Sequence, residues 1–287
     1  MTTDEFFSTI QGRVSNRVDA VRLACELEAH APKLGNVHPT ARFNDCEYHD
    51  FVVAASEIAP ILGSDDWSLS LGDRVLRAVE CTRMVTAANV NLGIILLIAP
   101  LAMADDLKML GNILMSITPQ DGRKVFEAIR LASPGGMKRD DIADEHDVQS
   151  THWQPIDLIA AMKQAADRDR IALQYASDFT DFFKNVVPIV REEVSRPIPV
   201  SAAIVLAQLR LMAHDIDSLI ARKCGIEVAA EARRRAADCL ASDSAQSRAA
   251  FDAWLRADGN CRNPGTTADL IAAALFWLLR ELREPNA

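Results

Sequence analysis

The most informative stretch for the fold is Asn91-Leu-Gly-Ile-Ile-Leu-Leu-Ile-Ala-Pro-Leu-Ala-Met-Ala104, which is uncharged and wholly apolar from Ile94 onward. A second run near the carboxyl end, Leu270-Ile-Ala-Ala-Ala-Leu-Phe-Trp-Leu-Leu279, has the same character. Both runs are well short of the ~20 residues that a bilayer-spanning helix needs. A helix that is apolar on every side is surrounded by other helices. We therefore expect two buried helices at the centre of the protein.

Helical spacing extends along the rest of the chain. An amphipathic helix is indicated early, where inward positions recur every three or four residues: Val14, Val18, Val21, Cys25 and Glu28. Residues 156–187 contain no glycine or proline and fit one long helix or two in sequence. No alternating strand bounded by Asn-Gly or Asp-Gly turns is visible. The sequence predicts an all-α fold, one globular multi-helix domain over residues 1–287.

Composition narrows the class of protein. The chain has 287 residues with 31 Lys and Arg against 40 Asp and Glu, a formal net charge of −9. A content of 49% hydrophobic and 25% charged residues is ordinary for a globular protein. An acidic balance without a basic tract argues against nucleic-acid binding, which needs many phosphate contacts. We expect neither a nucleic-acid partner nor a membrane.

Cysteine usage and the amino terminus bear on the compartment. Six cysteines are scattered without a Cys-x-x-Cys pair, which is typical of reduced cytoplasmic thiols rather than a disulfide framework. Cys46 and Cys261 are expected to pack as small apolar residues. The start, Met-Thr-Thr-Asp-Glu-Phe-Phe, lacks the basic region and apolar stretch of a signal peptide. The sequence predicts a cytoplasmic protein.

Three segments carry polar residues where apolar ones are expected, and the first surrounds Lys33. Glu28 ends the apolar face of its helix, so its carboxylate points inward, which is costly without a partner. Lys33 follows in a loop, and Gly35 allows a ligand to approach the backbone closely. Two interpretations stay open: a buried Glu28–Lys33 ion pair that ties the loop to its helix, or a ligand site.

The other two segments stand directly ahead of the apolar helices. Asn89-Val-Asn91-Leu-Gly93 precedes the first, and capping the helix uses one asparagine but leaves the second unexplained. Asn263-Pro-Gly-Thr-Thr-Ala-Asp269 precedes the second. Its threonines suit a helix cap, yet a helix start is also an anion site, and a carboxylate beside it suits a phosphate-bound Mg²⁺.

Common catalytic signatures are missing. The sequence has no phosphate loop of the GxxxxGK[ST] type, no GxGxxG, no GxSxG and no HExxH. His30, His38, Cys46 and His49 resemble metal ligands superficially, but their spacing matches no tetrahedral zinc pattern. A structural zinc is therefore not expected.

Taken together, the three segments resemble the triphosphoribosyl-dephospho-CoA synthase family. Members share an early Pro-Lys-Pro-Gly after a Glu-bearing helix, a following Asp-Met or Asp-Phe, a central Asn-Thr-x-x-Gly and a late Asn-Pro-Gly-x-x-x-Asp-Leu. The likeness covers about residues 15–280. The corresponding pieces here are Pro32-Lys-Leu-Gly35, Asp50-Phe51, Asn89-Val-Asn-Leu-Gly93, Gly135-Gly136 with Asp147-Val148, Arg168-Asp-Arg-Ile-Ala172, Asp217-Ser-Leu-Ile-Ala-Arg-Lys223 and Asn263-Pro-Gly-Thr-Thr-Ala-Asp-Leu270.

The resemblance implies an all-helical enzyme and a reaction. The ribose C1′ of ATP is transferred, with its triphosphate, to the 2′-hydroxyl of 3′-dephospho-CoA, and adenine is released. The product is the precursor of the prosthetic group of citrate or malonate decarboxylating lyase systems. Such a glycosyl transfer needs a carboxylate for the acceptor hydroxyl, Mg²⁺ for the triphosphate and a donor to the departing adenine.

The resemblance also implies roles for particular residues. Glu28 and Asp50 are the catalytic candidates, and Asp50 and Asp269 are the candidate Mg²⁺ ligands. Lys33 and the helix start at 265–267 are candidates for phosphate contacts, while Asn89 and Asn91 could read the ribose or adenine. The full set predicted to bind substrate is Lys33, Gly35, Asn36, His49, Asn89, Asn91, Gly93, Arg222, Asn263, Gly265, Thr266 and Thr267.

Departures from the family pattern leave the acceptor open. Leu34 replaces the second proline of the loop, His38 replaces an Asp, and Leu92 replaces a Lys in the central motif. An insertion at 39–45 lengthens the loop before Asp50. Dephospho-CoA is the default acceptor. One alternative is the same chemistry on another acceptor, such as a tetrahydromethanopterin-type pterin precursor, and another is a non-catalytic helical protein that binds a nucleotide or a partner.

Overall fold

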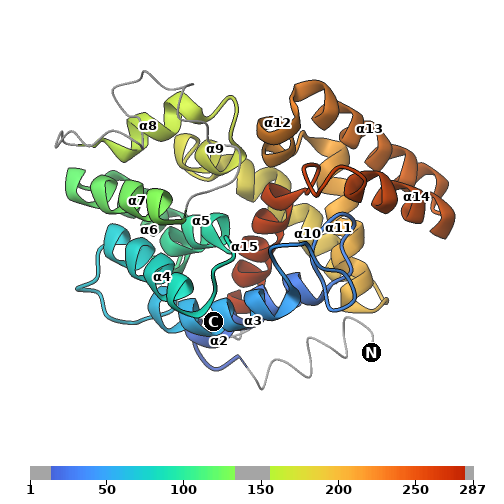
Figure 1. Ribbon diagram of the computed structural model, residues 1–287. Coiled ribbons are helices and arrows are strands. Elements are labelled where there is room, and N and C mark those ends of the chain that lie inside the picture. The colour runs from blue at the N-terminus through green and yellow to red at the C-terminus, as the bar shows by residue number, and fades with distance from the viewer. Residues whose placement is uncertain (1–13, 133–155, 282–287) are drawn as a thin grey trace.

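The computed structural model describes residues 14–132 and 156–281, and this part of the chain is almost entirely helical (Figure 1). Within these ranges no strand forms, and one isolated bridge joins His38 and Ala41. The all-α prediction is confirmed. The elements are α2 (Arg17–His30), α3 (Tyr48–Leu62), α4 (Leu71–Val85), α5 (Leu92–Met103), α6 (Leu107–Met115), α7 (Pro119–Ala132), α8 (Leu158–Ala165), α9 (Arg170–Ala176), the π-helix η1 (Phe182–Val186), α10 (Val187–Val194), α11 (Val200–His214), α12 (Ser218–Cys224), α13 (Ile226–Ser242), α14 (Ala245–Arg256) and α15 (Gly265–Glu281).

Short polar residues determine where seven of these helices begin. A side-chain oxygen of the residue before the helix accepts a hydrogen bond from a backbone N–H of the first turn, which has no partner inside the helix. The local sequence therefore determines where these helices begin. The residues that cap in this way are Asn16, Ser70, Asp106, Asp157, Asp169, Asp217 and Ser244.

The two apolar runs form the buried helices α5 and α15, as predicted. α5 is buried from Gly93 to Ala102, and α15 is buried from Leu270 to Arg280. α15 packs against α2, α5, α10 and α11, and in Figure 1 it runs through the middle of the fold among helices from both halves of the chain. None of the described helices combines the length and the apolar character that a membrane span requires.

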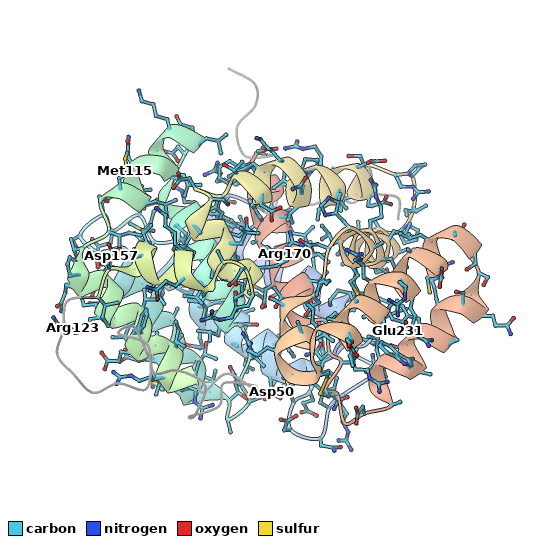
Figure 2. All side chains as sticks on the ribbon, turned by 90° about the horizontal axis from the view of Figure 1, so that it is seen from above. Asp50, Met115, Arg123, Asp157, Arg170 and Glu231 are labelled. Carbon is cyan, nitrogen blue, oxygen red and sulfur yellow. A yellow bond between two sulfur atoms is a disulfide. The ribbon has the colours of Figure 1, made fainter. Side chains whose placement is uncertain are left out.

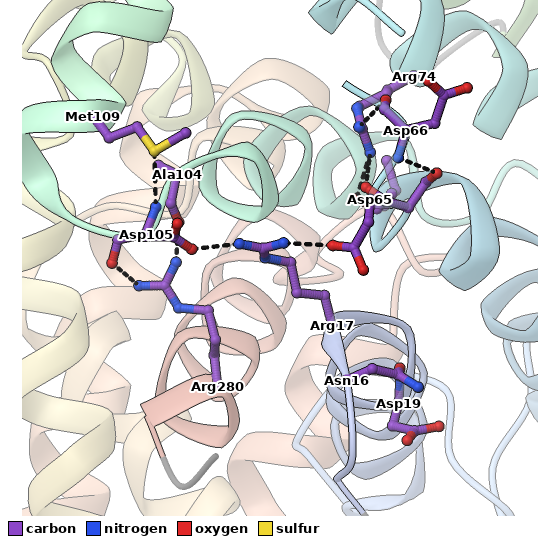
Figure 3. Close-up of polar contacts among 12 residues, drawn as sticks. Asn16, Arg17, Asp19, Asp65, Asp66, Arg74, Ala104, Asp105, Met109 and Arg280 are labelled. Atoms are coloured by element: carbon purple, nitrogen blue, oxygen red, sulfur yellow. Dashed lines mark hydrogen bonds and ion pairs between the residues drawn. The ribbon is translucent and has the colours of Figure 1, made fainter. Parts of the chain in front are cut away.

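α5 and α15 lie side by side and run in the same direction. At their far ends, Arg280 of α15 donates to the carbonyl oxygens of Ala104 and Asp105, which follow α5 (Figure 3). Arg17 at the start of α2 pairs with Asp105 and, at 2.7 Å, with Asp65. This network fixes one end of the central pair, so the starts of both helices lie together at the other end.

A second, smaller core places α14 beside the loop at 33–36. Leu34 from this loop packs with Leu209 and Met212 of α11, and with Phe251 and Leu255 of α14. The loop is thus held between helices that are more than 170 residues further along the chain. Figure 1 shows α13 and α14 as an antiparallel pair at one side of the molecule.

The prediction of one or two helices over 156–187 was wrong in detail. The structure has α8, α9 and η1 there, with α10 beginning at Val187. Asp169 caps α9, and the chain turns after Ser177 because Asp178 and Phe179 both have positive φ, 51° and 59°. Side chains other than glycine rarely adopt this backbone conformation, so helical periodicity could not indicate the break.

The prediction of reduced cysteines was wrong for one pair. Cys224 at the end of α12 and Cys261 in the loop before α15 form a disulfide across 37 residues, with a Cα–Cα distance of 6.3 Å. Cys261 is therefore not a packed free thiol. Spacing along the sequence did not reveal the pair because tertiary packing, rather than a short motif, brings α12 and this loop together. Cys25, Cys46, Cys81 and Cys239 carry free thiols.

Candidate active site

The starts of α5 and α15 meet at Gly93 and Asp269. A Cβ atom placed on Gly93 would lie 2.1 Å from Oδ2 of Asp269 and 2.7 Å from a methyl carbon of Ile171 in α9. No side chain fits in that space, so a glycine is required if the carboxylate is to lie there. The structure thus brings the central and the late motif into direct contact.

The starts of α9 and α12 join the same region. One oxygen of Asp217 caps α12, and the other accepts from the backbone N–H and the hydroxyl of Thr267 at 2.8 and 2.7 Å. The Ser218 hydroxyl donates to Thr266 at 3.0 Å and accepts from the N–H of Arg170. We call this convergence of the starts of α5, α9, α12 and α15 the junction. Each helix start carries partial positive charge, and at α9 and α12 the carboxylates of Asp169 and Asp217 already use it as caps.

Asp269 is the carboxylate of the junction that lacks a partner. It is partly buried, and no hydrogen bond or ion pair joins it to the described residues. Its pKa is raised well above the ordinary value, first by burial and then by the neighbouring charges of Glu28, Asp217 and Asp169, while Arg222 opposes the shift. Arg222 itself pairs with Asp169 at 3.0 Å. Asp269 therefore lies in a region of excess negative charge.

Lys33, by contrast, is fully engaged. Its ammonium group lies 2.8 Å from Oε1 of Glu28 and donates to the Glu28 carbonyl oxygen, and the two side chains are 1% and 5% exposed. The ion pair that the sequence left as one of two interpretations is present. A lysine enclosed in this way has its charge committed to Glu28 rather than available to a phosphate.

The rest of the loop at 33–36 is also hydrogen bonded throughout. Gln208, fully buried in α11, accepts from the Leu34 N–H and donates to the Leu34 carbonyl and to Oδ1 of Asn36, all within 2.9 Å. The Asn36 amide donates to Oδ1 of Asn263 at 2.7 Å, which links the early motif to the late one. Gly35 has a φ of +71° and lies against Leu255, so glycine is required there too.

α14 supports the same loop from outside. Asp252 accepts from the Gly35 N–H at 2.7 Å, and Arg256 donates to the Asn36 carbonyl at 2.7 Å while pairing with Asp252. Sequence reasoning missed these two residues, as it missed Gln208, because their partners lie far away in the chain. Asp169 and Asp217 stood within quoted motifs, but nothing local showed that they face Asp269.

The other predicted residues lie in α3 and in the segment that precedes α5. Asp50 accepts from the Glu47 N–H at 2.8 Å and from the Thr86 hydroxyl at 2.6 Å. It is not among the charges that most affect the Asp269 pKa, and Figure 2 shows it toward one edge of the view while Arg170 lies near the centre. His49 and Asn89 are exposed. The motif pieces Gly135-Gly136 and Asp147-Val148 lie outside the described residues.

Asn91 combines two unusual properties. Its φ is +64° and its side chain is only 5% exposed, yet neither Oδ1 nor Nδ2 has a hydrogen-bond partner among the described residues. Although it precedes α5, its side chain makes no capping bond. The second asparagine that the sequence left unexplained therefore remains unexplained by local structure.

Among the described residues, no group of three His, Cys, Asp or Glu side chains is arranged to hold a metal ion. Mg²⁺ at nucleotide sites is commonly held by one or two carboxylates together with substrate phosphates. The junction supplies carboxylates of that kind. Among the described residues, Glu28 forms an ion pair with Lys33 and Asp169 forms one with Arg222, whereas no ion pair joins Asp217 or Asp269.

Fold and site together define an all-helical protein whose polar residues gather where its two buried helices begin. The family model described as ATP:dephospho-CoA triphosphoribosyl transferase matches residues 15–287. The chain belongs to this family.

A solved structure supports the assignment. The chain is 25% identical to a crystal structure from Archaeoglobus fulgidus described as a candidate triphosphoribosyl-dephospho-CoA synthase, with a TM-score of 0.62 over 81% of this chain and 98% of that one. No curated protein matches the chain. The predicted family and transferase class are confirmed, and the activity is ATP-dependent triphosphoribosyl transfer to dephospho-CoA. Neither the pterin acceptor nor the non-catalytic alternative is favoured.

Proposed function

We propose that the junction is where this transfer occurs. The observation that carries the proposal is Asp269, a partly buried carboxylate without a hydrogen-bond partner, held against Gly93 where two buried helices begin. Family membership supplies the reaction, and the junction is the place where motifs distant in sequence come together. Because the donor is ATP, we also propose that the protein works in the cytoplasm and that its partners are ATP and a hydroxyl acceptor.

The reaction exchanges one bond at C1′ for another. The C1′–N9 bond of ATP breaks, and its electron pair leaves with adenine, which takes up a proton from solvent as it is released. The 2′-oxygen of dephospho-CoA forms the new bond to C1′, and its proton goes to a carboxylate. Glu28 and Asp269, whose charges act on each other, are the residues proposed to accept that proton or to hold it near the acceptor hydroxyl.

Mg²⁺ fits the junction because Asp269 is a carboxylate with no ion pair among the described residues and lies near other carboxylates, and Asp269 is the residue proposed to hold the ion together with the substrate phosphates. When bound, the ion would supply positive charge to the triphosphate. Asp50, which was predicted to share this role, has hydrogen bonds to Glu47 and Thr86 instead. We propose that Asp50 positions the segment that leads to α5, because the Thr86 hydroxyl that it binds also accepts from the Ala88 N–H.

The predicted phosphate contacts divide into two groups. Lys33, Thr266 and Thr267 are used inside the protein, by Glu28, Ser218 and Asp217 respectively. We propose that they position the junction and that the helix starts provide the attraction for the triphosphate. Arg222, whose guanidinium lies beside Asp169 and acts on Asp269, remains the side chain proposed to approach the phosphates.

Adenine release tests this proposal. The purified chain is incubated with ATP, Mg²⁺ and dephospho-CoA, and free adenine and the mass of the coupled product are measured by chromatography and mass spectrometry. We expect adenine and product in equal amounts. Release with a pterin precursor but not with dephospho-CoA would instead favour the alternative acceptor. Asp238→Asn, an exposed position on α13, serves as the matched control for variants of Asp269.

A further inference from the structure

The side chain of Asn91 presents an unpaired donor and an unpaired acceptor at the junction. Asn91 is only 5% exposed. Neither Nδ2 nor Oδ1 has a hydrogen-bond partner among the described residues. Leaving a buried polar group unpaired destabilises the folded protein. A residue that served only to cap α5 would use its oxygen for a first-turn N–H, and this one does not. The position therefore calls for another explanation.

The backbone holds Asn91 firmly in place. The Ile95 N–H donates to the Asn91 carbonyl at 2.8 Å, and Val90 packs in a small core with Ala54 and Ala88. Gly93, two residues further on, touches Asp269. Asn91 is therefore fixed at the start of α5, two residues before the glycine that meets the carboxylate of Asp269.

The chemistry of the amide selects among the parts of ATP. A planar group with a donor beside an acceptor pairs best with an edge that offers an acceptor beside a donor. Phosphate oxygens offer acceptors alone. The adenine edge offers N7 as acceptor and the 6-amino group as donor, and asparagine reads this edge with two hydrogen bonds. The unpaired state of both amide atoms thus favours the base over the triphosphate.

We propose that Asn91 recognises the adenine of the ATP donor, with Nδ2 donating to N7 and Oδ1 accepting from the 6-amino group. The proposal rests on the function proposed above. As C1′–N9 breaks, the bond's electron pair moves onto the purine, and a hydrogen bond at N7 stabilises that charge. Guanine has O6 in place of the amino group, which would set Oδ1 against another acceptor. Asn91 thereby also distinguishes ATP from GTP, by a factor of about 5–150 in kcat/KM.

The test compares ATP with 7-deaza-ATP, in which N7 is replaced by C–H. We measure kcat/KM for base release with dephospho-CoA in the wild type, in Asn91→Ala and in Asn112→Ala, an exposed asparagine of α6. The wild type and Asn112→Ala should prefer ATP by the same factor. Asn91→Ala should lose activity with ATP and reduce that preference about tenfold. An unchanged preference would overturn the proposal, because the amide would then face the ribose or phosphates.

A second variant and a folding control accompany this test. Asn91→Asp, which presents only acceptors to N7, should reverse the preference toward 7-deaza-ATP, and thermal unfolding shows whether each variant is folded. If the wild type releases no adenine at all, the proposed function is wrong. The proposed contact between Asn91 and adenine is then tested by nucleotide binding alone. Thermal stabilisation by Mg·ATP should then exceed that by Mg·7-deaza-ATP in the wild type and equal it in Asn91→Ala.

Discussion

The loop at 33–36 and the junction both contain buried polar side chains, but within the described part of the chain these side chains have partners inside the protein in the loop and lack them at Asn91 and Asp269. In the loop, Lys33 is paired with Glu28, and Gln208 satisfies Leu34 and Asn36. At the junction, Asn91 has no hydrogen-bond partner among the described residues, and no hydrogen bond contributes to the pKa shift of Asp269. The two regions meet through the hydrogen bond between Asn36 and Asn263.

This difference distinguishes residues that stabilise the fold from residues that act on the substrate. A polar side chain whose hydrogen bonds are all made inside the protein stabilises the fold, and replacing it leaves other groups unsatisfied. A polar side chain kept buried without partners costs stability and is retained where a ligand completes it. We therefore expect variants of the loop to change stability most, and variants of the junction to change activity most.

Asp269→Asn should show the largest effect. The substitution keeps the size of the side chain but removes the charge, so adenine release should fall about 10²–10⁴-fold, the usual contribution of a carboxylate in proton transfer. The melting temperature should stay the same or rise, because Glu28, Asp217 and Asp169 no longer face another carboxylate. Activity and thermal unfolding are measured beside Asp238→Asn, and near-normal activity in Asp269→Asn would remove this residue from the mechanism.

Lys33→Met comes next and should act through stability. It leaves the Glu28 carboxylate buried without its cation, which costs about 3–5 kcal/mol. Urea unfolding followed by circular dichroism measures the loss. The double variant Glu28→Leu with Lys33→Met should recover most of that stability, since no charge is then buried. A stable Lys33→Met protein that has lost adenine release would show instead that Lys33 contacts the substrate.

Gln208→Leu should have a smaller effect of the same kind. It leaves the Leu34 N–H and carbonyl and the Asn36 oxygen unpaired, with an expected loss of about 1–3 kcal/mol. The denaturation midpoint is compared with that of Gln164→Leu, an exposed glutamine of α8. Adenine release per folded molecule should change little. A large loss of activity at unchanged stability would contradict this prediction, because the loop would then take part in the reaction.

The sequence was sufficient for the central architecture but not for the partners. A charge-free apolar run can only be buried, so α5 and α15 followed from composition alone. Lys33 shows the limit: its position could be read, but whether it met Glu28 or a ligand depended on tertiary packing. Gln208 lies 174 residues from Leu34, and no local pattern marks such a contact. Gly93 and Asp269 stood in two motifs, yet their contact became visible only when both helices were placed.

The smallest effect concerns pH and compares Asp269 with a carboxylate that is fully bonded. Burial alone would raise the pKa of Asp181, but hydrogen bonds from Asn185, Gln174 and Arg170 outweigh it and lower the pKa. The stability that Asp181 contributes is therefore present above about pH 4 and lost as the pH falls. The raised pKa of Asp269 has the opposite sign, because the folded protein then binds the proton more tightly than the unfolded chain, so stability falls as the pH rises from about 4. Melting curves between pH 2 and 8 should show Asp269→Asn becoming more stable relative to the wild type as the pH rises above about 4. Asp181→Asn should become less stable relative to the wild type as the pH rises to about 4, and that difference should stay constant above it. Parallel curves for Asp269→Asn and the wild type would mean that the ionised Asp269 carboxylate does not destabilise the folded protein. The contrast between loop and junction would then depend on Asn91 alone.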